Sequence, residues 1–370
     1  MNKKLFAALA AVVMSACMGC KAEIPPYLIV DGTTVVGYTD KLPAKLVIPK
    51  GITKIAGGAF YGCKWLESVT IPGSVKTIGE DITFEEIIEK GLRNEDISVF
   101  GGCTSLKSVT MENGVTKIGR QAFDDCMALV SVTIPGSMTT IGWQAFDGCK
   151  SLKRVTIPKS VTTMGVDTFY GCESLVSVTI ENGLTEIGSN AFKFCHSLAS
   201  VTIPYSVTTI GEGAFEFCDN LAEVTYNGTL AQWCQIDNNW SLLSNAKSIR
   251  LSDAENLKAL TTLTIPNGVT KIGSYAFDSC ESLKSIEIPD SVTEIGNGAF
   301  YDCKSLASVA IPDSVTTISE YAFEGCDNLK EMFIDSTMEQ VKNRWTTVYG
   351  NMDLKSGTLI HCADGDLRVN

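Results

Sequence analysis

The sequence has little histidine, few charged residues and no long apolar run. Its 370 residues include two histidines, His196 and His361, so a metal centre or catalytic triad built on histidine has little to draw on. Charged residues make up 19% of the chain, and the formal net charge is −12. This negative balance disfavours nucleic acid and anionic membrane surfaces as partners. Because no apolar run reaches the roughly 18 residues that cross a bilayer, the sequence predicts no transmembrane helix.

Known catalytic signatures are missing as well. The chain contains no Gly-x-Ser-x-Gly, His-Glu-x-x-His, phosphate-binding loop or dinucleotide fingerprint. Aspartate and glutamate are scattered along the chain, as on a solvated surface. We therefore expect no enzyme, no catalytic residue, no cofactor and no metal site.

The N-terminus has the pattern of a processing signal. Two basic residues, Lys3 and Lys4, precede a short apolar stretch that ends near Met14, and small residues then stand directly before Cys17. This arrangement resembles the lipobox of bacterial lipoproteins. The resemblance implies a signal peptide at 1–16, lipidation of Cys17 or alternatively Cys20, and an acylated tether at 17–26 that anchors an exported protein to a membrane. An ordinary secretory signal cut nearby is the other interpretation.

Ten of the 14 cysteines occupy one repeated position in the chain. Most neighbours in this series are 23 residues apart, and a period of that length predicts a solenoid whose units pack only against adjacent units. The series is Cys63, Cys103, Cys126, Cys149, Cys172, Cys195, Cys218, Cys280, Cys303 and Cys326.

We interpret these ten cysteines as a structural ladder of packed thiols, since free cysteine behaves as a small, easily buried hydrophobe. A few disulfides between neighbouring repeats are an alternative, although disulfide geometry is demanding and a continuous column cannot pair throughout. Metal binding fits least well, because the repeats contain no Cys-x-x-Cys spacing.

One repeat predicts a coil with a short strand. Leu152, Val155 and Ile157 alternate with polar residues and should face inward, whereas Arg154 and Thr156 should face outward. An Ile-Gly turn and an Ala-Phe pair follow in most copies and would fill the far side of the coil. Stacked repeats should therefore form a right-handed coil, with a parallel β-sheet on the concave face and short return segments on the convex face.

The repeated pattern Leu-x-Ser-Val-Thr-Ile-Pro-x-Ser-Val-Thr-x-Ile-Gly-x-x-Ala-Phe-x-x-Cys resembles the BspA-type leucine-rich repeats of bacterial surface proteins. The resemblance covers about residues 27–334 with two interruptions. It implies a leucine-rich-repeat solenoid that is exported and exposed at the cell surface or outer membrane. It also implies adhesion to host matrix proteins or to other cells.

Breaks in the regularity divide the repeat region into parts. We expect an N-terminal repeat block at 27–225 with an insert at 80–97, degenerate repeats at 226–260, a C-terminal repeat block at 261–334 and a C-terminal cap at 335–370. The insert should hold a short, acidic, amphipathic helix. The degenerate segment should leave the sheet continuous, with Trp233 and Trp240 packed over the edge of the stack.

The outward column of the strands is the candidate binding face. Threonine favours exposed strand positions for structural reasons alone, but a stripe of hydroxyls could also form a weakly charged platform for a ligand. The candidate residues are Thr110, Thr133, Thr156, Thr179, Thr202, Thr225 and the basic Arg154.

A host matrix or cell-surface protein is the expected partner of this face. A glycan is a second possibility, although exposed aromatic residues should be nearly absent from the strand face. The alternative function is a scaffold of the cell envelope that has no host ligand.

Overall fold

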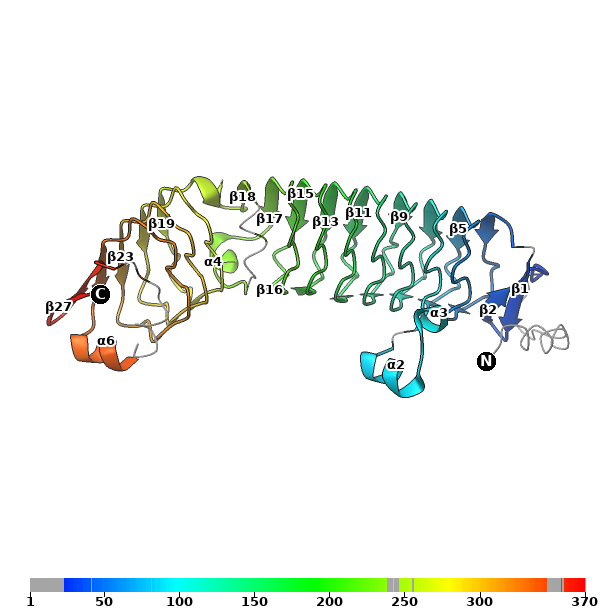
Figure 1. Ribbon diagram of the computed structural model, residues 1–370, viewed down its shortest axis with the longest axis horizontal. Coiled ribbons are helices and arrows are strands. Elements are labelled where there is room, and N and C mark those ends of the chain that lie inside the picture. The colour runs from blue at the N-terminus through cyan, green and yellow to red at the C-terminus, as the bar shows by residue number, and fades with distance from the viewer. Residues whose placement is uncertain are drawn as a thin grey trace. The chain divides into compact units, whose positions relative to one another are not determined.

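The computed structural model describes residues 23–369 except 41, 81, 238–241, 243–245, 255, 345–353 and 355. The chain divides into two compact units. The first runs to Val176 and includes Phe194–His196, and the second comprises Ser177–Lys193 and the chain from Ser197 onward. Within each unit the chain winds through stacked turns, most with a long strand and a short return strand (Figure 1).

In the first unit the turns build two parallel ladders. One sheet has the order β3-β5-β7-β9, and β11 lies beside β9. The return strands, of two residues each, form a second ladder with the order β4-β6-β8-β10-β12. The long strands are β3 (Lys45–Val47), β5 (Ser68–Ile71), β7 (Ser108–Met111), β9 (Ser131–Thr133) and β11 (Arg154–Ile157). The return strands are β4 (Lys54–Ile55), β6 (Thr77–Ile78), β8 (Lys117–Ile118), β10 (Thr140–Ile141) and β12 (Thr163–Met164).

The register of these ladders stacks equivalent repeat positions. Thr70 pairs with Thr110, and Thr110 pairs with Thr133. The period-2 pattern fixes this register, because a slip by one residue would turn the apolar side chains out to solvent. In β11, Val155 and Ile157 are buried and Arg154 and Thr156 are exposed. The predicted repeat solenoid with a parallel sheet is confirmed.

A phenylalanine column fills the interior between the two ladders. Phe60, Phe100, Phe123, Phe146 and Phe169 are fully buried, and successive ring centroids lie 5.1–5.2 Å apart with nearly parallel planes. This spacing slightly exceeds the ~4.8 Å between strands, as offset stacking of aromatic rings requires.

The N-terminal end of the phenylalanine column is covered by a hairpin. Strands β1 (Leu28–Asp31) and β2 (Thr34–Tyr38) pair antiparallel, and β2 then joins β4 in parallel. The ring of Tyr38 stacks on Phe60 at 5.9 Å. The hairpin therefore closes an end that would otherwise expose Phe60 to water.

All ten cysteines of the ladder are buried and have free thiols. The Cys149 thiol donates a hydrogen bond to the carbonyl oxygen of Phe123, 26 residues earlier, at 3.3 Å, and Cys126 and Cys172 repeat this contact with Phe100 and Phe146. Burial raises the pKa of the Cys103 thiol to about 12, so the sulfur keeps its proton. The thiol thus ties one turn to the preceding turn as a hydrogen-bond donor, in addition to filling space.

The insert at 80–97 contains the predicted helix and a second, shorter one. Helix α2 (Phe84–Lys90) begins with a capping box of Thr83 and Glu86, and α3 (Asn94–Ile97) follows. The insert lies close to an earlier turn, since a Cβ on Gly57 would meet the Asp96 carbonyl oxygen at 2.5 Å. Figure 1 shows α2 projecting from the stack, where Ile88 is 66% exposed.

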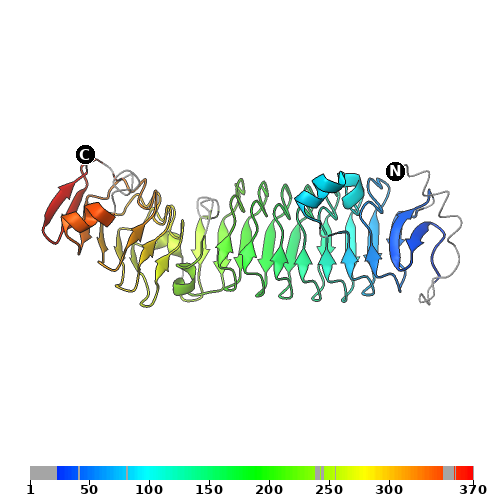
Figure 2. The same cartoon turned by 90° about the horizontal axis from the view of Figure 1, so that it is seen from below.

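The second unit contains two separate blocks of long strands, seen side by side in Figure 2. Strands β13, β15, β17 and β18 are paired in that order, and β19, β21, β23, β25, β26 and β27 form a six-stranded sheet. The first block is β13 (Ser177–Ile180), β15 (Ser200–Ile203), β17 (Glu223–Tyr226) and β18 (Ser248–Arg250). The second is β19 (Thr262–Thr264), β21 (Ser285–Glu287), β23 (Ser308–Ile311), β25 (Glu331–Ile334), β26 (Leu359–Cys362) and β27 (Gly365–Arg368). The return strands are β14 (Glu186–Ile187), β16 (Thr209–Ile210), β20 (Lys271–Ile272), β22 (Glu294–Ile295) and β24 (Thr317–Ile318).

The sheet is not continuous through the degenerate segment, contrary to expectation. β18 pairs with β17, and the next ladder starts at β19 after the short helix η1 (Leu257–Ala259). Within the described residues β18 and β19 belong to different sheets. The chain before and after β18 does not form a regular turn. The repeat register is therefore interrupted between β17 and β19.

Trp233 also lies elsewhere than predicted. It ends helix α4 (Leu230–Trp233), whose capping box joins Thr229 and Gln232. Its side chain is only 2% exposed, and its indole Nε1–H donates to the Ala276 carbonyl oxygen at 2.8 Å. Trp233 is therefore a core residue and not an edge cover, because this hydrogen bond satisfies its polar atom inside. Trp240 lies outside the described residues.

The C-terminal segment ends the second block with helix α6 (Met338–Arg344) and a hairpin. β26 pairs in parallel with β25, and β27 turns back to pair antiparallel with β26. The outer strand β27 alternates half-buried and exposed residues. A hairpin with polar residues on its outer strand exposes fewer apolar groups at the end of a solenoid than an uncovered repeat would.

Candidate functional site

The outer surface of the long strands carries the candidate threonines. In the first unit Thr110, Thr133 and Thr156 are exposed on β7, β9 and β11, and Arg154 is exposed on β11. In the second unit Thr179 is exposed on β13, while Thr202 and Thr225 are half-buried on β15 and β17. The predicted residues thus fall on the outer face of their strands, three threonines in each unit.

The hydroxyls of these six threonines have no hydrogen-bond partner in the part of the chain that the structure describes. A second threonine series, just before the return strands, behaves differently. The hydroxyl of Thr139 donates to the Thr116 carbonyl oxygen at 3.0 Å, and Thr162 makes the equivalent contact with Thr139 at 3.5 Å. One series therefore ties turns together, whereas the outer series leaves its donors and acceptors available to a ligand.

Charge is sparse on the outer threonine surfaces. Lys107 binds Glu67 beside the row of the first unit. In the second unit Arg250 stands in the row itself, in register with Thr225, and binds Glu223. These pairs are exposed and contribute little to stability. The hydroxyl rows therefore present a polar surface on which Arg154 is the predicted cation.

In the last block the same strand position changes character. The residues stacked there are Thr264, Glu287, Ala310, Phe333 and His361. The Phe333 side chain is 44% exposed, and its ring stacks on the His361 imidazole at 4.7 Å. Exposed aromatic residues were expected to be nearly absent from this face, and Phe333 is an exception whose outward position the strict alternation of Glu331–Ile334 could have shown.

The two histidines occupy different surroundings. His361 Nδ1 lies 3.0 Å from Asp366 Oδ1 on the neighbouring strand. His196 is exposed and lies near the ring of Phe194, with centroids 5.9 Å apart. No set of three or more histidine, cysteine or carboxylate side chains is arranged for a metal ion among the described residues.

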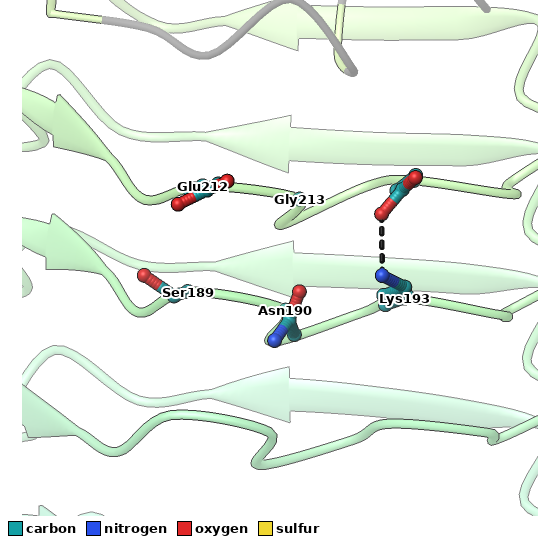
Figure 3. Close-up of a pocket in the computed structure, with 6 residues that line it drawn as sticks. Ser189, Asn190, Lys193, Glu212 and Gly213 are labelled. Carbon is teal, nitrogen blue, oxygen red and sulfur yellow. Dashed lines mark ion pairs between the residues drawn. The ribbon is translucent and has the colours of Figure 1, made fainter.

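A shallow depression lies on the return side of the second unit, between two successive turns (Figure 3). Its volume is about 340 Å³, and Lys193 and Glu216 form an ion pair across it at 2.5 Å. The Lys193 ammonium also lies over the ring of Phe217. Lys193 and Glu216 neutralise one another there, so Glu212, which is exposed, gives the depression a net negative charge. Its lining is Ser189, Asn190, Lys193, Glu212, Gly213 and Glu216.

Two stacked carboxyls on the return side of the first unit have unusual acidity. Burial, together with the charges of neighbouring aspartates, raises the pKa of Asp124 and of Asp147 to about 7. Gln144 Nε2 donates to Asp147 Oδ2 at 3.4 Å, and Gln121 Nε2 donates to Gln144 Oε1 at 3.2 Å. This amide chain follows the stacking direction and stabilises adjacent turns.

The membrane-anchoring residues predicted from the leader, Cys17 and Cys20, lie outside the described residues. None of the helices that the structure describes has the length and apolarity needed to cross a bilayer.

Comparison with known protein families identifies the repeat. A family model described as the BspA type leucine rich repeat region matches residues 38–150, 82–195, 116–236 and 247–356. The chain belongs to this family. BspA-type repeats therefore cover both units, including the insert at 80–97 and most of the degenerate segment. A comparison with curated proteins found no match.

Several solved structures are similar to this BspA-type protein. A leucine rich repeat protein of T. pallidum is 26% identical, and the match covers 56% of this chain and 90% of that one with a TM-score of 0.43. A leucine-rich repeat protein of Bacteroides ovatus is 23% identical over 95% of this chain and 100% of that one, with a TM-score of 0.42. A leucine rich cell surface protein of Faecalibacterium prausnitzii is 26% identical over 88% and 97%, with a TM-score of 0.37.

Proposed function

We propose that this BspA-type protein is an exported, lipid-anchored surface protein that binds a protein of a host or neighbouring cell. The binding surface is the outer face of the long strands. The leader with Cys17 supports export and anchoring, with Cys20 as the alternative acylation site. The family supports a repeat protein whose surface, and not a catalytic centre, carries its function.

The observation that carries the proposal is the contrast between the two threonine series. Thr139 and Thr162 use their hydroxyls to join turns, whereas Thr133 and Thr156 are exposed with hydroxyls that no protein group engages. A stacked strand surface of free hydroxyls can hydrogen-bond a partner without leaving buried charges unpaired. The net charge of −12 disfavours nucleic acid, and recognition by such a surface needs no cofactor.

Binding to immobilised matrix proteins, alongside a glycan panel, tests this proposal. We compare the full-length protein with two double variants, Thr133→Lys with Thr156→Lys in the first unit and Thr179→Lys with Thr202→Lys in the second. We expect saturable binding to a protein that at least one pair abolishes, because lysine side chains fill and charge the hydroxyl surface. The melting temperature should stay nearly unchanged, since Thr133, Thr156 and Thr179 are exposed and the half-buried Thr202 lies on the same outer face.

A matched control places the same charges on the other threonine series. The double variant Thr139→Lys with Thr162→Lys should bind as the wild type does. Loss of binding in this control but not in the strand-face variants would place the interface on the return side. Absence of binding to every protein in the panel would favour an envelope scaffold, and protection of the protein from trypsin on intact cells would support that alternative.

The anchor is tested separately by fractionation. Cys17→Ala should move the protein from the membrane to the soluble fraction, because acyl chains supply its membrane affinity. Membrane retention in this variant that is lost on adding Cys20→Ala would assign the lipid to Cys20. Retention in the double variant would contradict lipidation at either cysteine.

A further inference from the structure

The outer face of the last block contains a gap in its side-chain row. In this row each strand contributes one outward residue, in the order Thr264, Glu287, Ala310, Phe333 and His361. Ala310 is exposed and carries only a methyl group, whereas the residues on both sides of it are large. The row therefore has an open position above Ala310, between Glu287 and Phe333.

The orientation of the Phe333 ring makes this gap a slot. His361 stacks on one face of the ring, with centroids 4.7 Å apart and an interplanar angle of 14°. Because β25 lies between β23 and β26, the other ring face is turned toward the Ala310 position. Neighbouring strands lie ~4.8 Å apart, so a flat group at the Ala310 position would sit at stacking distance from Phe333.

The opposite wall of the slot is acidic. Glu287 accepts a hydrogen bond from the Thr264 hydroxyl through Oε2 at 3.0 Å, which holds its carboxylate toward Thr264, on the side of β21 away from Ala310. Glu331 is exposed two residues before Phe333 on the same strand, and Asp366 pairs with His361 beyond the ring. Exposed cations lie at the start of these strands, where Lys284 and Lys330 stand three residues before Glu287 and Phe333.

We infer that this slot, formed by Glu287, Ala310 and Phe333, binds an arginine side chain of a protein partner. A guanidinium is flat and cationic, stacks on aromatic rings and pairs with carboxylates through its parallel N–H groups. In the slot it would lie on the open face of Phe333, and its charge would draw the Glu287 carboxylate from the Thr264 hydroxyl into hydrogen bonds with its own N–H groups. The partner thus supplies the side chain that the row lacks.

Lysine and sugars fit the slot less well. An ammonium is compact and strongly hydrated, so it cannot cover the ring face as a planar group does. A sugar ring could stack on Phe333 but would leave the negative charge of Glu287 without a counter-charge. The slot shares no residue with the threonine surfaces, so the two proposals fail or succeed independently.

Titration of the full-length protein, labelled with ¹³C in its alanine methyl groups, tests the inference by NMR. The probe is N-acetyl-arginine amide, and the comparison probe is N-acetyl-citrulline amide, which has nearly the same shape without the charge. We expect the Ala310 methyl signal to shift saturably with the arginine probe. The citrulline probe should bind at least about fivefold more weakly, since cation–π attraction and the charge pair are both lost.

Two variants of the same turn provide a matched pair. Ala310→Phe fills the slot with a ring that stacks on Phe333, so it should abolish the response, whereas Ala307→Phe at an exposed position before β23 should leave it intact. For the Ala310→Phe variant, the methyl signal of Ala307 reports the response, and its melting temperature shows whether the fold is kept. Glu287→Gln should weaken arginine binding at least about threefold, as loss of a charge-assisted hydrogen bond does.

Three results would overturn the inference. Equal shifts with the arginine and citrulline probes would show that charge plays no part. Shifts with methyl glucoside but none with arginine would make the slot a glycan site. A full arginine response in Ala310→Phe would place the binding elsewhere.

Discussion

A regular turn and the irregular segment fill the interior of the solenoid in different ways. Phe146 is fully buried between Phe123 and Phe169, at 5.2 Å from each, and its carbonyl accepts the Cys172 thiol. Trp233 instead packs edge-on against Tyr226 at 5.3 Å and depends on one indole hydrogen bond to Ala276, 43 residues later. The ring of the regular turn is thus packed between identical neighbours on both sides, whereas the Trp233 side chain meets the ring of Tyr226 and a backbone carbonyl.

The largest loss of stability should follow from removing one ring of the phenylalanine column. Phe146→Ala should lower the free energy of unfolding by ~3–5 kcal/mol, because it removes a fully buried ring from between two stacked rings. Urea denaturation followed by circular dichroism measures the loss. Phe146→Leu, which keeps most of the volume, should cost under about 1.5 kcal/mol. Equal losses in the two variants would contradict the stacking argument.

A smaller effect is expected from the indole hydrogen bond of Trp233 in the irregular segment. Trp233→Phe removes the indole donor and leaves the Ala276 carbonyl without it, which should lower stability by ~1–3 kcal/mol. Hydrogen exchange should show the opening confined to the second unit. Trp143→Phe is the control, since Trp143 is exposed, and it should change stability by under about 1 kcal/mol. A Trp143 effect as large as that of Trp233 would argue against the role of the indole hydrogen bond.

Each cysteine of the thiol ladder should contribute less to the free energy of unfolding than the side chain of Phe146 or of Trp233 does. Cys149→Ala removes the donor to Phe123 and a small buried volume, and we expect a loss of ~1 kcal/mol. Cys149→Ser keeps a donor and should lose less than the alanine variant. Mild reductant should leave the circular dichroism of the wild type unchanged, because the ten thiols are free. Collapse of the signal in reductant would instead reveal structural disulfides.

The smallest effect we expect is a pH dependence that differs between the two regions. The folded state raises the pKa of Asp147 to about 7 and that of Asp278, near the irregular segment, to about 6. Both shifts arise mainly from burial, but for Asp278 the Ser279 hydroxyl and the Lys258 charge oppose the shift. A raised carboxyl pKa means that the folded state holds the proton more tightly than the unfolded chain does.

The contribution of these protons to stability is therefore fully present below about pH 4, the unfolded pKa of aspartate. It is lost as the pH rises through about 6 for Asp278 and about 7 for Asp147. The melting temperature should fall from pH 5 to pH 8, and Asp147→Asn should flatten the upper part of that fall. Asp290→Asn, at an exposed position, is the control. An identical slope in Asp147→Asn and the wild type would contradict the assignment.

Sequence reasoning recovered the parts of the fold that repeat. The alternation of Leu152, Val155 and Ile157 placed the strand and its buried face, because side chains on a strand point to opposite sides in turn. It left open whether the return segments are extended or helical, since two-residue strands form only when stacking brings them together. It also misplaced Trp233, whose hydrogen-bond partner lies 43 residues away.

For the candidate site, the pattern predicted which threonines stand on the outer face but not which are free. Thr156 and Thr162 look alike in the sequence, yet only Thr162 donates to a carbonyl of the preceding turn. Phe333 was overlooked as a surface residue because it replaces a threonine in one repeat only, although the alternation of Glu331–Ile334 marks its position as outward-facing.

The sequence by itself determined the solenoid, its register and its column of phenylalanine and cysteine, because a 23-residue period puts equivalent residues in contact whenever turns stack. The tertiary structure decided which hydroxyls are bonded, where the sheet stops and starts, and which single substitutions open a slot such as that above Ala310. Those features depend on the neighbours that a residue meets one turn away. A repeat pattern describes what the copies share and omits the substitutions that distinguish one copy from the next.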